Sequence, residues 1–464
     1  MIRCLCLALA TFILTACQPA PFLRPDIPVP EDWPRYGGHP AGGVALSERS
    51  WDEIYPLPEL TALIDEAIGQ GTELRIALDR VELARAQYGL ERAALFPGVG
   101  GSASITRQRA PGFDPNENQV SENASLTLAV PSWEIDLWGK LAARTEAARQ
   151  EVLASEATAH AVRVSVAAQV ASLYFELLDL DNQLAISERT HESRRHALRL
   201  NQARFDAGIA SVLDVRQAES LLASSVQAIA DQRRRLALAE NALSVLLGRN
   251  PGPIDRSASL GTLPFPSGVL AGLPSELLLR RPDILAAEHS LRGAEANIVA
   301  ARKAYLPSIS LTTTLGLISP EMRNLLDGGR DAWLVQPTLA LPIFTGGQLR
   351  AGVESAEAGQ RIALEQYGNT IRQAFREVSD ALTAHTELSR QREAALVAAQ
   401  ANRERLRIAK ARYLSGITSY FEVLDAERQL FDSELGLSQN TRAVHQAVVQ
   451  LYRALGGGWT RPVD

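Results

Sequence analysis

The sequence is poor in cysteine, methionine and aromatic residues. Its 464 residues include three cysteines, two methionines and 6% aromatics. The cysteines are Cys4, Cys6 and Cys17, so the rest of the chain can form no disulfide, thiol nucleophile or cysteine metal site. Basic residues are also in the minority. The formal net charge of −6 argues against a nucleic-acid partner, which usually requires a basic face.

Long apolar runs are absent except at the amino terminus. There, Arg3 precedes an apolar stretch from Leu5 to Leu14, which is of signal-peptide length and too short to span a bilayer. The stretch ends in Leu14-Thr15-Ala16-Cys17, an order that resembles a bacterial lipobox. We therefore predict a lipoprotein signal peptide over 1–16 and acylation of Cys17. The alternative is an ordinary signal peptide that contains a cysteine.

The anchor has consequences for the mature chain. Cleavage would remove two cysteines and the lipid would occupy the third, which leaves no free thiol. Gln18 follows the cysteine, and because an Asp there would favour retention in the inner membrane, we expect the outer membrane.

Motifs that carry chemistry are also missing. The sequence contains no phosphate-binding loop, dinucleotide fingerprint, zincin pattern or nucleophile elbow. His191 and His196 lie five residues apart on an expected helix and do not share a face well. We expect no catalytic residue, no metal and no cofactor, and the protein is predicted not to be an enzyme.

The chain repeats itself once. Arg204-Phe205-Asp206-Ala207-Gly208-Ile209 recurs as Arg412-Tyr413-Leu414-Ser415-Gly416-Ile417, and Leu246-Leu247-Gly248 recurs as Ala454-Leu455-Gly456. The offset is about 208 to 210 residues throughout. Two copies at one spacing indicate an internal duplication, and each copy is expected to read helix, two strands, very long helix and helix.

Long helices give the strongest pattern. Residues 140–205 contain no proline and no glycine, and their apolar residues follow spacings of four and three, as in Val166, Val170, Leu173, Leu177, Leu180 and Leu184. The counterpart covers roughly 348–413. Further helices are expected over 58–95 and 212–246, and we expect 72–96 and 212–246 to stack end to end beside a long helix.

Four strands are expected, over 98–109, 122–135, 307–318 and 332–344. Apolar and polar residues alternate in them, as in Ala124, Leu126, Leu128 and Val130 against Ser125 and Thr127, and as in Trp333, Val335, Leu339, Leu341 and Ile343 on one face. Their length suits a tilted transmembrane strand. Four strands cannot close a barrel, so copies of the chain would have to pool their strands. The alternative is a small water-exposed sheet beside a coiled coil.

Three stretches resemble a known family. They are 272–284 (GLPSELLLRRPDI), 341–347 (LPIFTGG) and 455–459 (LGGGW). Together with the duplication they resemble the TolC-like outer-membrane efflux proteins, in the lipoprotein (OprM/NodT-type) branch, over essentially the whole mature chain.

The resemblance implies a mixed α and β fold. A trimeric outer-membrane β-barrel, with four strands per chain and twelve in total, would continue as a long periplasmic α-helical coiled-coil barrel. Residues 1–16 would be the signal peptide and 17–57 a lipid-anchored extended segment, while 58–256 and 257–464 would be the two structural repeats. The implied partners are two further copies in a homotrimer, outer-membrane lipid, a periplasmic adaptor protein and an inner-membrane pump of the resistance–nodulation–division type.

The resemblance also implies where control lies. Positions matching Glu422 and Asp425 form an acidic ring at the periplasmic entrance, with Phe421 as an apolar constriction. Asp214 and Tyr413 match a link that holds the entrance shut, and we expect them to bond to each other. The turns at Gly208 and Gly416 match the places where the adaptor docks.

Two other functions stay open at this point. One is a lipid-anchored periplasmic coiled-coil scaffold without a pore, which would not need the paired strands. The other is an outer-membrane duct for type I protein secretion. The short carboxyl terminus favours small-molecule efflux over protein secretion, and the residues name no substrate.

Overall fold

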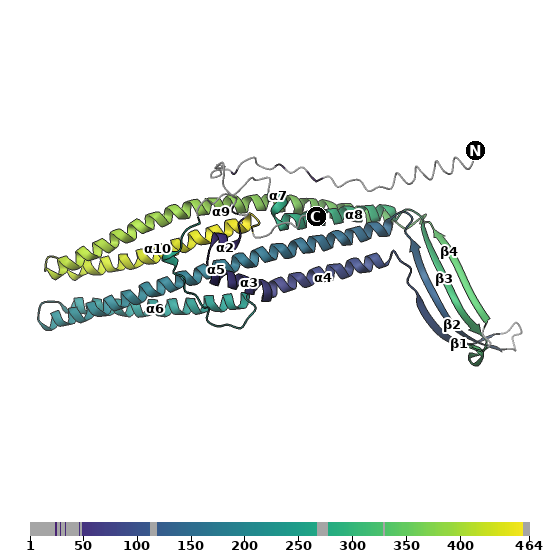
Figure 1. Ribbon diagram of the computed structural model, residues 1–464, viewed down its shortest axis with the longest axis horizontal. Coiled ribbons are helices and arrows are strands. Elements are labelled where there is room, and N and C mark those ends of the chain that lie inside the picture. The colour runs from purple at the N-terminus through teal and green to yellow at the C-terminus, as the bar shows by residue number, and fades with distance from the viewer. Residues whose placement is uncertain are drawn as a thin grey trace. The chain divides into compact units, whose positions relative to one another are not determined.

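The computed structural model describes residues 24, 25, 28, 33, 46, 49–111, 118–266, 277–327 and 330–457. Cys17 lies outside these residues. The chain divides into two compact units (Figure 1). The sheet unit includes Arg80–Glu156 and Ala286–Gly368, and the helix unit includes Ala157–Leu285 and Asn369–Asp464. Each unit draws on both halves of the chain, so the repeat boundaries at 58–256 and 257–464 do not mark compact units and stay a prediction.

The long helices come in two matched pairs. Helices α5 (Lys140–Asp206) and α9 (Gln348–Leu414) have 67 residues each, and α6 (Val212–Leu246) and α10 (Tyr420–Ala454) have 35 each. Every bound of the second pair lies 208 residues after its counterpart, since 140 + 208 = 348 and 212 + 208 = 420. Equal lengths at one constant offset are what the predicted duplication requires.

The remaining helices are shorter. They are α2 (Trp51–Ile54), α3 (Pro58–Gln70), α4 (Thr72–Ala93), α7 (Leu277–Arg280) and α8 (Pro282–Lys303), with 3₁₀ segments η2 (Leu260–Thr262) and η4 (Met322–Asn324). The single helix expected over 58–95 is therefore wrong, because Gly71 divides it. A side chain at Gly71 would meet the Ala67 carbonyl at 2.2 Å, so only glycine fits the break.

The short helices do stack end to end. Where α6 ends and α4 begins, a Cβ on Gly248 would lie 2.4 Å from the Gln70 carbonyl, so the two backbones are in contact. Where α10 ends and α8 begins, Arg281 Nη1 donates to the Ala454 carbonyl at 2.7 Å. A cation there also suits the negative end of the α10 dipole. The prediction of end-to-end stacking is confirmed.

The core of the helix unit forms along α5. Four of the six residues of the predicted heptad row are buried there, since Val166, Val170, Leu177 and Leu180 are all at most 4% exposed. The other two, Leu173 and Leu184, are partly buried. A stretch of α5 is apolar enough for a membrane span, but 56% of that stretch is buried inside the protein, as in a core helix. The row therefore packs against protein, as the heptad pattern predicts.

The sheet unit contains one antiparallel sheet of four strands. These are β1 (Gly100–Pro111), β2 (Asn118–Ile135), β3 (Ser308–Ser319) and β4 (Arg330–Ala340), hydrogen-bonded in the order β1-β2-β3-β4. The four predicted strands are confirmed, but the last ends at Ala340 and not at 344. Leu341 and Ile343 therefore lie outside it, because Pro342 lacks the N–H that would extend the ladder.

The two faces of the sheet differ in chemistry. On one face hydroxyls pair across β1 and β2, with Ser102 and Thr127 Oγ atoms 2.9 Å apart and those of Ser104 and Ser125 2.8 Å apart. The other face carries large apolar side chains, among them Leu315 at 63% and Trp333 at 73% exposure. Within the described residues no strand pairs with the outer edges of β1 and β4.

A histidine is fully buried in the helix unit. The His445 ring stacks between Phe175 and Phe265, with ring centroids 5.0 and 4.5 Å away. The Tyr55 hydroxyl lies 3.2 Å from Nδ1. Burial, helped by the positive charge of Arg392, lowers the pKa of His445 to about 4, so the imidazole is neutral at pH 7.

This histidine should make stability fall in mild acid. Its pKa is lower in the folded than in the unfolded state, so the stability it supports is complete above pH 6.5 and is lost as pH falls towards 4. The slope would be about 1.4 kcal/mol per pH unit. We expect His445→Gln to unfold at lower temperature at pH 7 but to lose less stability between pH 6.5 and 4.5. The measurement is the thermal midpoint of purified protein by circular dichroism, with His196→Gln as control. Parallel pH profiles for wild type and His445→Gln would contradict the assignment.

Candidate functional site

Two helix hairpins end in matching turns within the helix unit. We call residues 201–218 and 409–426 the helix tips. Gly208 has φ 72° and Gly416 has φ 71°, values that favour glycine. In each turn the next residue donates back into the helix, Ile209 N to Arg204 O at 2.8 Å and Ile417 N to Arg412 O at 3.0 Å. Both glycines therefore lie at helix ends, in the left-handed conformation that such turns require.

A small apolar cluster packs the two tips together. It consists of buried residues from α6, α9 and α10, namely Ala218, Ala409, Tyr413, Tyr420, Val423 and Ala426. The Tyr413 and Tyr420 rings lie 5.3 Å apart. The cluster joins a hairpin of the first repeat to a hairpin of the second.

Tyr413 bonds to the first repeat through Asn201. Its hydroxyl donates to Asn201 Oδ1 at 2.7 Å, and the Asn201 side chain is fully buried. The Arg204 guanidinium lies 4.7 Å from the Tyr413 ring centroid. Burial raises the pKa of the Tyr413 phenol, so the hydroxyl keeps its proton and remains a donor at pH 7.

Asp214 is engaged elsewhere. Its carboxylate accepts from the Ser211 amide at 3.0 Å and from the Ser211 hydroxyl at 2.9 Å, which caps α6. The expected hydrogen bond between Asp214 and Tyr413 is therefore not formed within this chain. The cap satisfies the carboxylate, and the buried asparagine satisfies the phenol. Asp214 still lies close enough for its charge to help raise the pKa of Tyr413.

Asp425 is an ion-paired carboxylate. Arg405 Nη2 lies 2.6 Å and Arg428 Nη2 3.1 Å from its oxygens, and Gln429 donates to it at 3.2 Å. The expectation of an acidic ring at Glu422 and Asp425 did not include these partners. Arg405 and Asp425 are each ten residues from Ser415, so the antiparallel hairpin places them opposite each other, and this spacing could have revealed the pair.

Glu422 and Phe421 are exposed, in contrast to the ion-paired Asp425. Both lie in the first turn of α10 and both are exposed, Phe421 at 65%. Glu422 has no ion-pair partner in the part of the chain that the structure describes. Of the three residues expected at an entrance, Glu422 alone presents an uncompensated charge, and Phe421 presents an uncovered ring.

Two buried glutamates join the repeats above the tips, and sequence analysis missed both. Glu434 accepts from Arg189 of α5 and from Arg403 of α9, each at 2.7 Å. Glu427, with a 4% exposed side chain, lies 2.9 Å from Lys410 Nζ and accepts from Ser193 of α5 at 3.3 Å. Each carboxylate sits in α10 and reaches a helix of the other repeat, so replacing either would remove a polar contact between the repeats whose acidic end is buried.

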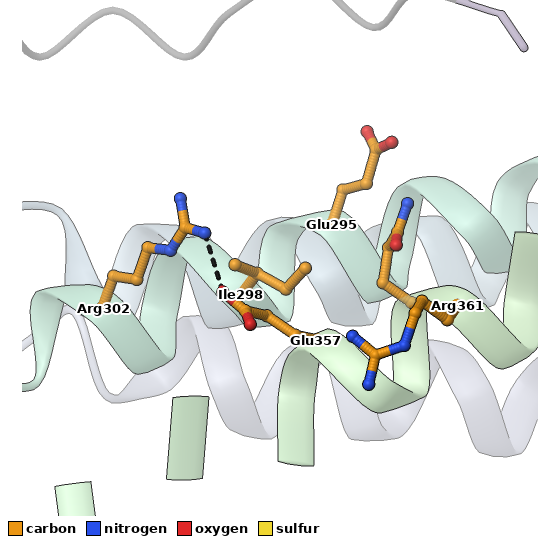
Figure 2. A pocket seen from close by; sticks show the side chains of 6 residues that line it. Glu295, Ile298, Arg302, Glu357 and Arg361 are labelled. Carbon is orange, nitrogen blue, oxygen red and sulfur yellow. Dashed lines mark hydrogen bonds and ion pairs between the residues drawn. The ribbon is translucent and has the colours of Figure 1, made fainter. Parts of the chain in front are cut away.

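An open groove away from the tips brings together one ion pair and a separate carboxylate. Figure 2 shows an open groove of about 440 Å³ between α8 and α9. Arg302 and Glu357 pair there at 2.8 Å, and Glu295 points away from them. Burial raises the pKa of Glu295. Over the described residues no group of three or more histidine, cysteine, aspartate or glutamate side chains could hold a metal ion.

A comparison with protein families decides the affiliation. The model described as "Outer membrane efflux protein" matches residues 63–249 and 273–457. The chain belongs to the outer membrane efflux protein family. The two matched segments cover corresponding parts of the two halves.

Relatives of this efflux protein are similar along nearly their whole length. Outer membrane protein OprJ of Pseudomonas aeruginosa is 40% identical over 458 residues, 97% of this chain and 95% of that protein. The toluene efflux pump outer membrane protein TtgC of Pseudomonas putida is 36% identical over 462 residues, 98% of this chain and 95% of that protein.

Solved structures of outer-membrane channels are also similar to this chain. The open-state MtrE channel of Neisseria gonorrhoeae is 32% identical with a TM-score of 0.86, covering 95% of this chain and 98% of that chain. CusC is 33% identical with a TM-score of 0.84, covering 94% and 99%.

The efflux protein is therefore an outer-membrane channel subunit with a periplasmic part. Its fold is that of trimeric channels, in which four strands in each of three chains make twelve. In outer-membrane barrels the outward face is apolar and the interior is polar, and the sheet has one face of each kind. The TolC-like resemblance, the fold class and the location expected from the sequence are confirmed.

The hydrogen bond between Tyr413 and Asn201 should protect the helix tips from proteolysis. Tyr413→Phe leaves a buried amide oxygen without its donor, a loss of about 1–3 kcal/mol. We expect trypsin to cleave at Arg412 at least about fivefold faster. Tyr305→Phe, on an exposed tyrosine outside the tips, is the control. Equal cleavage of all three proteins would show that the bond does not hold the tips.

Proposed function

We propose that this channel is the passive outer-membrane duct of a tripartite efflux system. An inner-membrane pump of the resistance–nodulation–division type would deliver small molecules through a periplasmic adaptor, and the chain would catalyse nothing. The observation that supports this most is the four-stranded sheet with two unpaired edges and an exposed apolar face, attached to helices of 67 residues.

The amphipathic sheet argues against a scaffold without a pore. A coiled-coil scaffold needs no amphipathic sheet, and side chains such as Leu128, Leu315 and Trp333 would be left in water. In a barrel the same side chains face lipid, and every backbone group on the edges finds a partner in a neighbouring copy.

Relatives suggest the cargo. Their names refer to toluene, solvents and antibiotics. We propose that the cargo is small organic molecules and not protein, with the choice made by the pump.

A deletion strain should accumulate a fluorescent hydrophobic dye and regain efflux from the cloned gene. Normal efflux in the deletion strain, with loss of a secreted protein, would favour the secretion duct instead.

The tips are the proposed docking place of the adaptor. Both turns leave apolar residues uncovered in the single chain, among them Ile209 at 67% and Ile417 at 68% exposure. These residues follow the two glycines, so the same shape would be offered twice per chain and six times per trimer.

The entrance is the proposed selectivity site. Three copies would bring three Glu422 carboxylates to a narrow opening, beside three Phe421 rings. Such a ring favours cations. Asp425 would add less charge because Arg405 and Arg428 compensate it. The acidic ring is thereby reduced from six carboxylates to three that act at full strength.

Channel recordings can separate these contributions. Glu422→Gln should lower the preference for cations more than Asp425→Asn does, and Arg405→Ala should raise it because Asp425 is released. Reversal potentials in planar bilayers under a KCl gradient measure this, with the exposed Glu82→Gln as control. Phe421→Ala should raise conductance. A larger effect from Asp425→Asn than from Glu422→Gln would refute the assignment.

The lipid anchor is proposed on sequence grounds. We propose that Cys17 is acylated and serves as a tether, since pore closure depends on strand pairing and not on lipid. Mass spectrometry of the mature amino-terminal peptide should find acylated Cys17. Cys17→Ser, exported with an ordinary signal peptide, should still conduct. Loss of conductance at normal trimer levels would contradict the tether role.

A further inference from the structure

Each strand of the sheet has one end next to a helix and one end away from it. Helices α4 and α8 lead into β1 and β3, and β2 and β4 lead into α5 and α9. The helices form the periplasmic part of the channel. The opposite ends of the strands, at Pro111, Asn118, Ser319 and Arg330, therefore lie towards the outer leaflet of the membrane.

The hairpin of β1 and β2 projects beyond its neighbour at this outer end. Its last pair joins Pro111 to Asn118, whereas the last pair of β2 with β3 joins Ala124 to Ser319. Six further pairs of β1 with β2 therefore lie past the end of β3, since 124 − 118 = 6.

Two arginines occupy the apolar face of the projecting hairpin. Side chains alternate along β1, and the regular ladder places Arg107 and Arg109 on the face of Ile105, away from the paired hydroxyl of Ser104. Both arginines are exposed, and neither forms an ion pair with another residue that the structure describes. Two cations thus stand on a face that is otherwise suited to lipid.

The position of these arginines matches the outer boundary of the apolar band. A strand rises about 3.3 Å per residue, so at a tilt of about 40° Arg107 and Arg109 lie about 18 and 23 Å above Gly100, where β1 begins. The apolar band of an outer-membrane barrel is about 25 Å tall. A charge at its centre is costly, whereas an arginine near its edge reaches the headgroups with its flexible stem.

A phosphate-bearing headgroup suits this pair of side chains. Each guanidinium can hold a phosphate through two parallel N–H donors. Residues two apart on a strand lie about 6–7 Å apart, so both arginines can reach one large headgroup. In the outer leaflet of a Gram-negative outer membrane the phosphates belong to lipid A, the glycolipid part of lipopolysaccharide, which carries them on a disaccharide.

We propose that Arg107 and Arg109 bind the phosphates of a lipopolysaccharide molecule on the outer surface of the barrel. Its acyl chains would lie against Ile105, Leu126 and Leu128, which share this face and are 59%, 43% and 58% exposed. The proposal rests on the outer-membrane channel fold and not on the proposed pump, adaptor or cargo.

Two carboxylates share this face of the sheet. Glu122 lies opposite Arg107 in the ladder, and its charge opposes a bound phosphate. Asp331 of β4 pairs with Leu317 and therefore has the same orientation. Because β1 and β4 are the edges of the sheet, closure brings Asp331 of a neighbouring copy beside β1. An ion pair between copies is the competing use of the arginines.

Binding of purified lipid A tests the site. Delipidated trimer in detergent is titrated with lipid A, and the bound lipid is counted by native mass spectrometry. Arg107→Gln/Arg109→Gln should weaken binding at least about tenfold, because charge-assisted bonds to phosphate are lost. Glu122→Gln should strengthen binding. Arg330→Gln is the matched control, since Arg330 pairs with Ile318 on the hydroxyl-rich face at the same end of the sheet.

Other ligands identify the source of the phosphate. Lipid A treated with phosphatase and the phospholipid phosphatidylglycerol should each bind at least about tenfold more weakly than intact lipid A, and millimolar inorganic phosphate should not displace it. Equal binding of phosphatidylglycerol, or displacement by inorganic phosphate, would overturn the assignment to the glycolipid.

The remaining outcomes separate the lipid site from the channel. Unchanged binding of lipid A to intact trimers of the double glutamine variant would overturn the site, and so would Glu122→Gln without a gain in affinity. Fewer trimers in both the double variant and Asp331→Asn, with lipid binding per trimer unchanged, would assign the arginines to the pair between copies instead. Conductance should stay the same in the double variant because the arginines face away from the interior, so a failed lipid site leaves the channel function standing.

Discussion

The hydrogen-bonding groups along the outer edges of β1 and β4 are the constraint on which the rest of the structure depends. In lipid no water can satisfy them, so the sheet must close. One chain supplies too few strands, and closure therefore requires neighbouring copies. The sheet has one apolar and one hydroxyl-rich face, so closure also creates a polar interior. A polar passage is therefore a consequence of pairing the backbone hydrogen-bonding groups at the edges of the sheet.

Duplication supplies two helix hairpins of equal length per chain, so three chains bring six hairpins together. Equal lengths do not make the hairpins chemically alike. The contact between α5 and α10 inside the chain is polar, with Glu434 paired to Arg189 and Ser438 bonded to Asp179. The positions that correspond to Glu434 and Arg189 at the repeat offset are Val226 and Val397, so small differences distinguish otherwise repeated helices.

At the tips, two bonds act at different places. Tyr413 donates to a buried asparagine of the other repeat, whereas Arg405 pairs with Asp425 within the hairpin of the second repeat. Parting the two hairpins would break the first bond and leave the second intact. The contact between the repeats and the charge of the proposed entrance therefore depend on separate residues.

The sequence by itself determined the helices, the strands, the duplication and the class of protein. Periodicity reports which face of an element is buried, and the turn glycines mark where helices end. The sequence did not predict the break at Gly71 or the early end of β4 at Ala340. It also did not predict the hydrogen-bond and ion-pair partners of Asp214, Tyr413 and Asp425. Those depend on which helices meet and in what register. Only the tertiary structure decided that the Ser211 cap would occupy Asp214, that Asn201 would bind Tyr413 and that Arg405 would neutralise Asp425, because a polar side chain bonds to the partner that packing brings nearest.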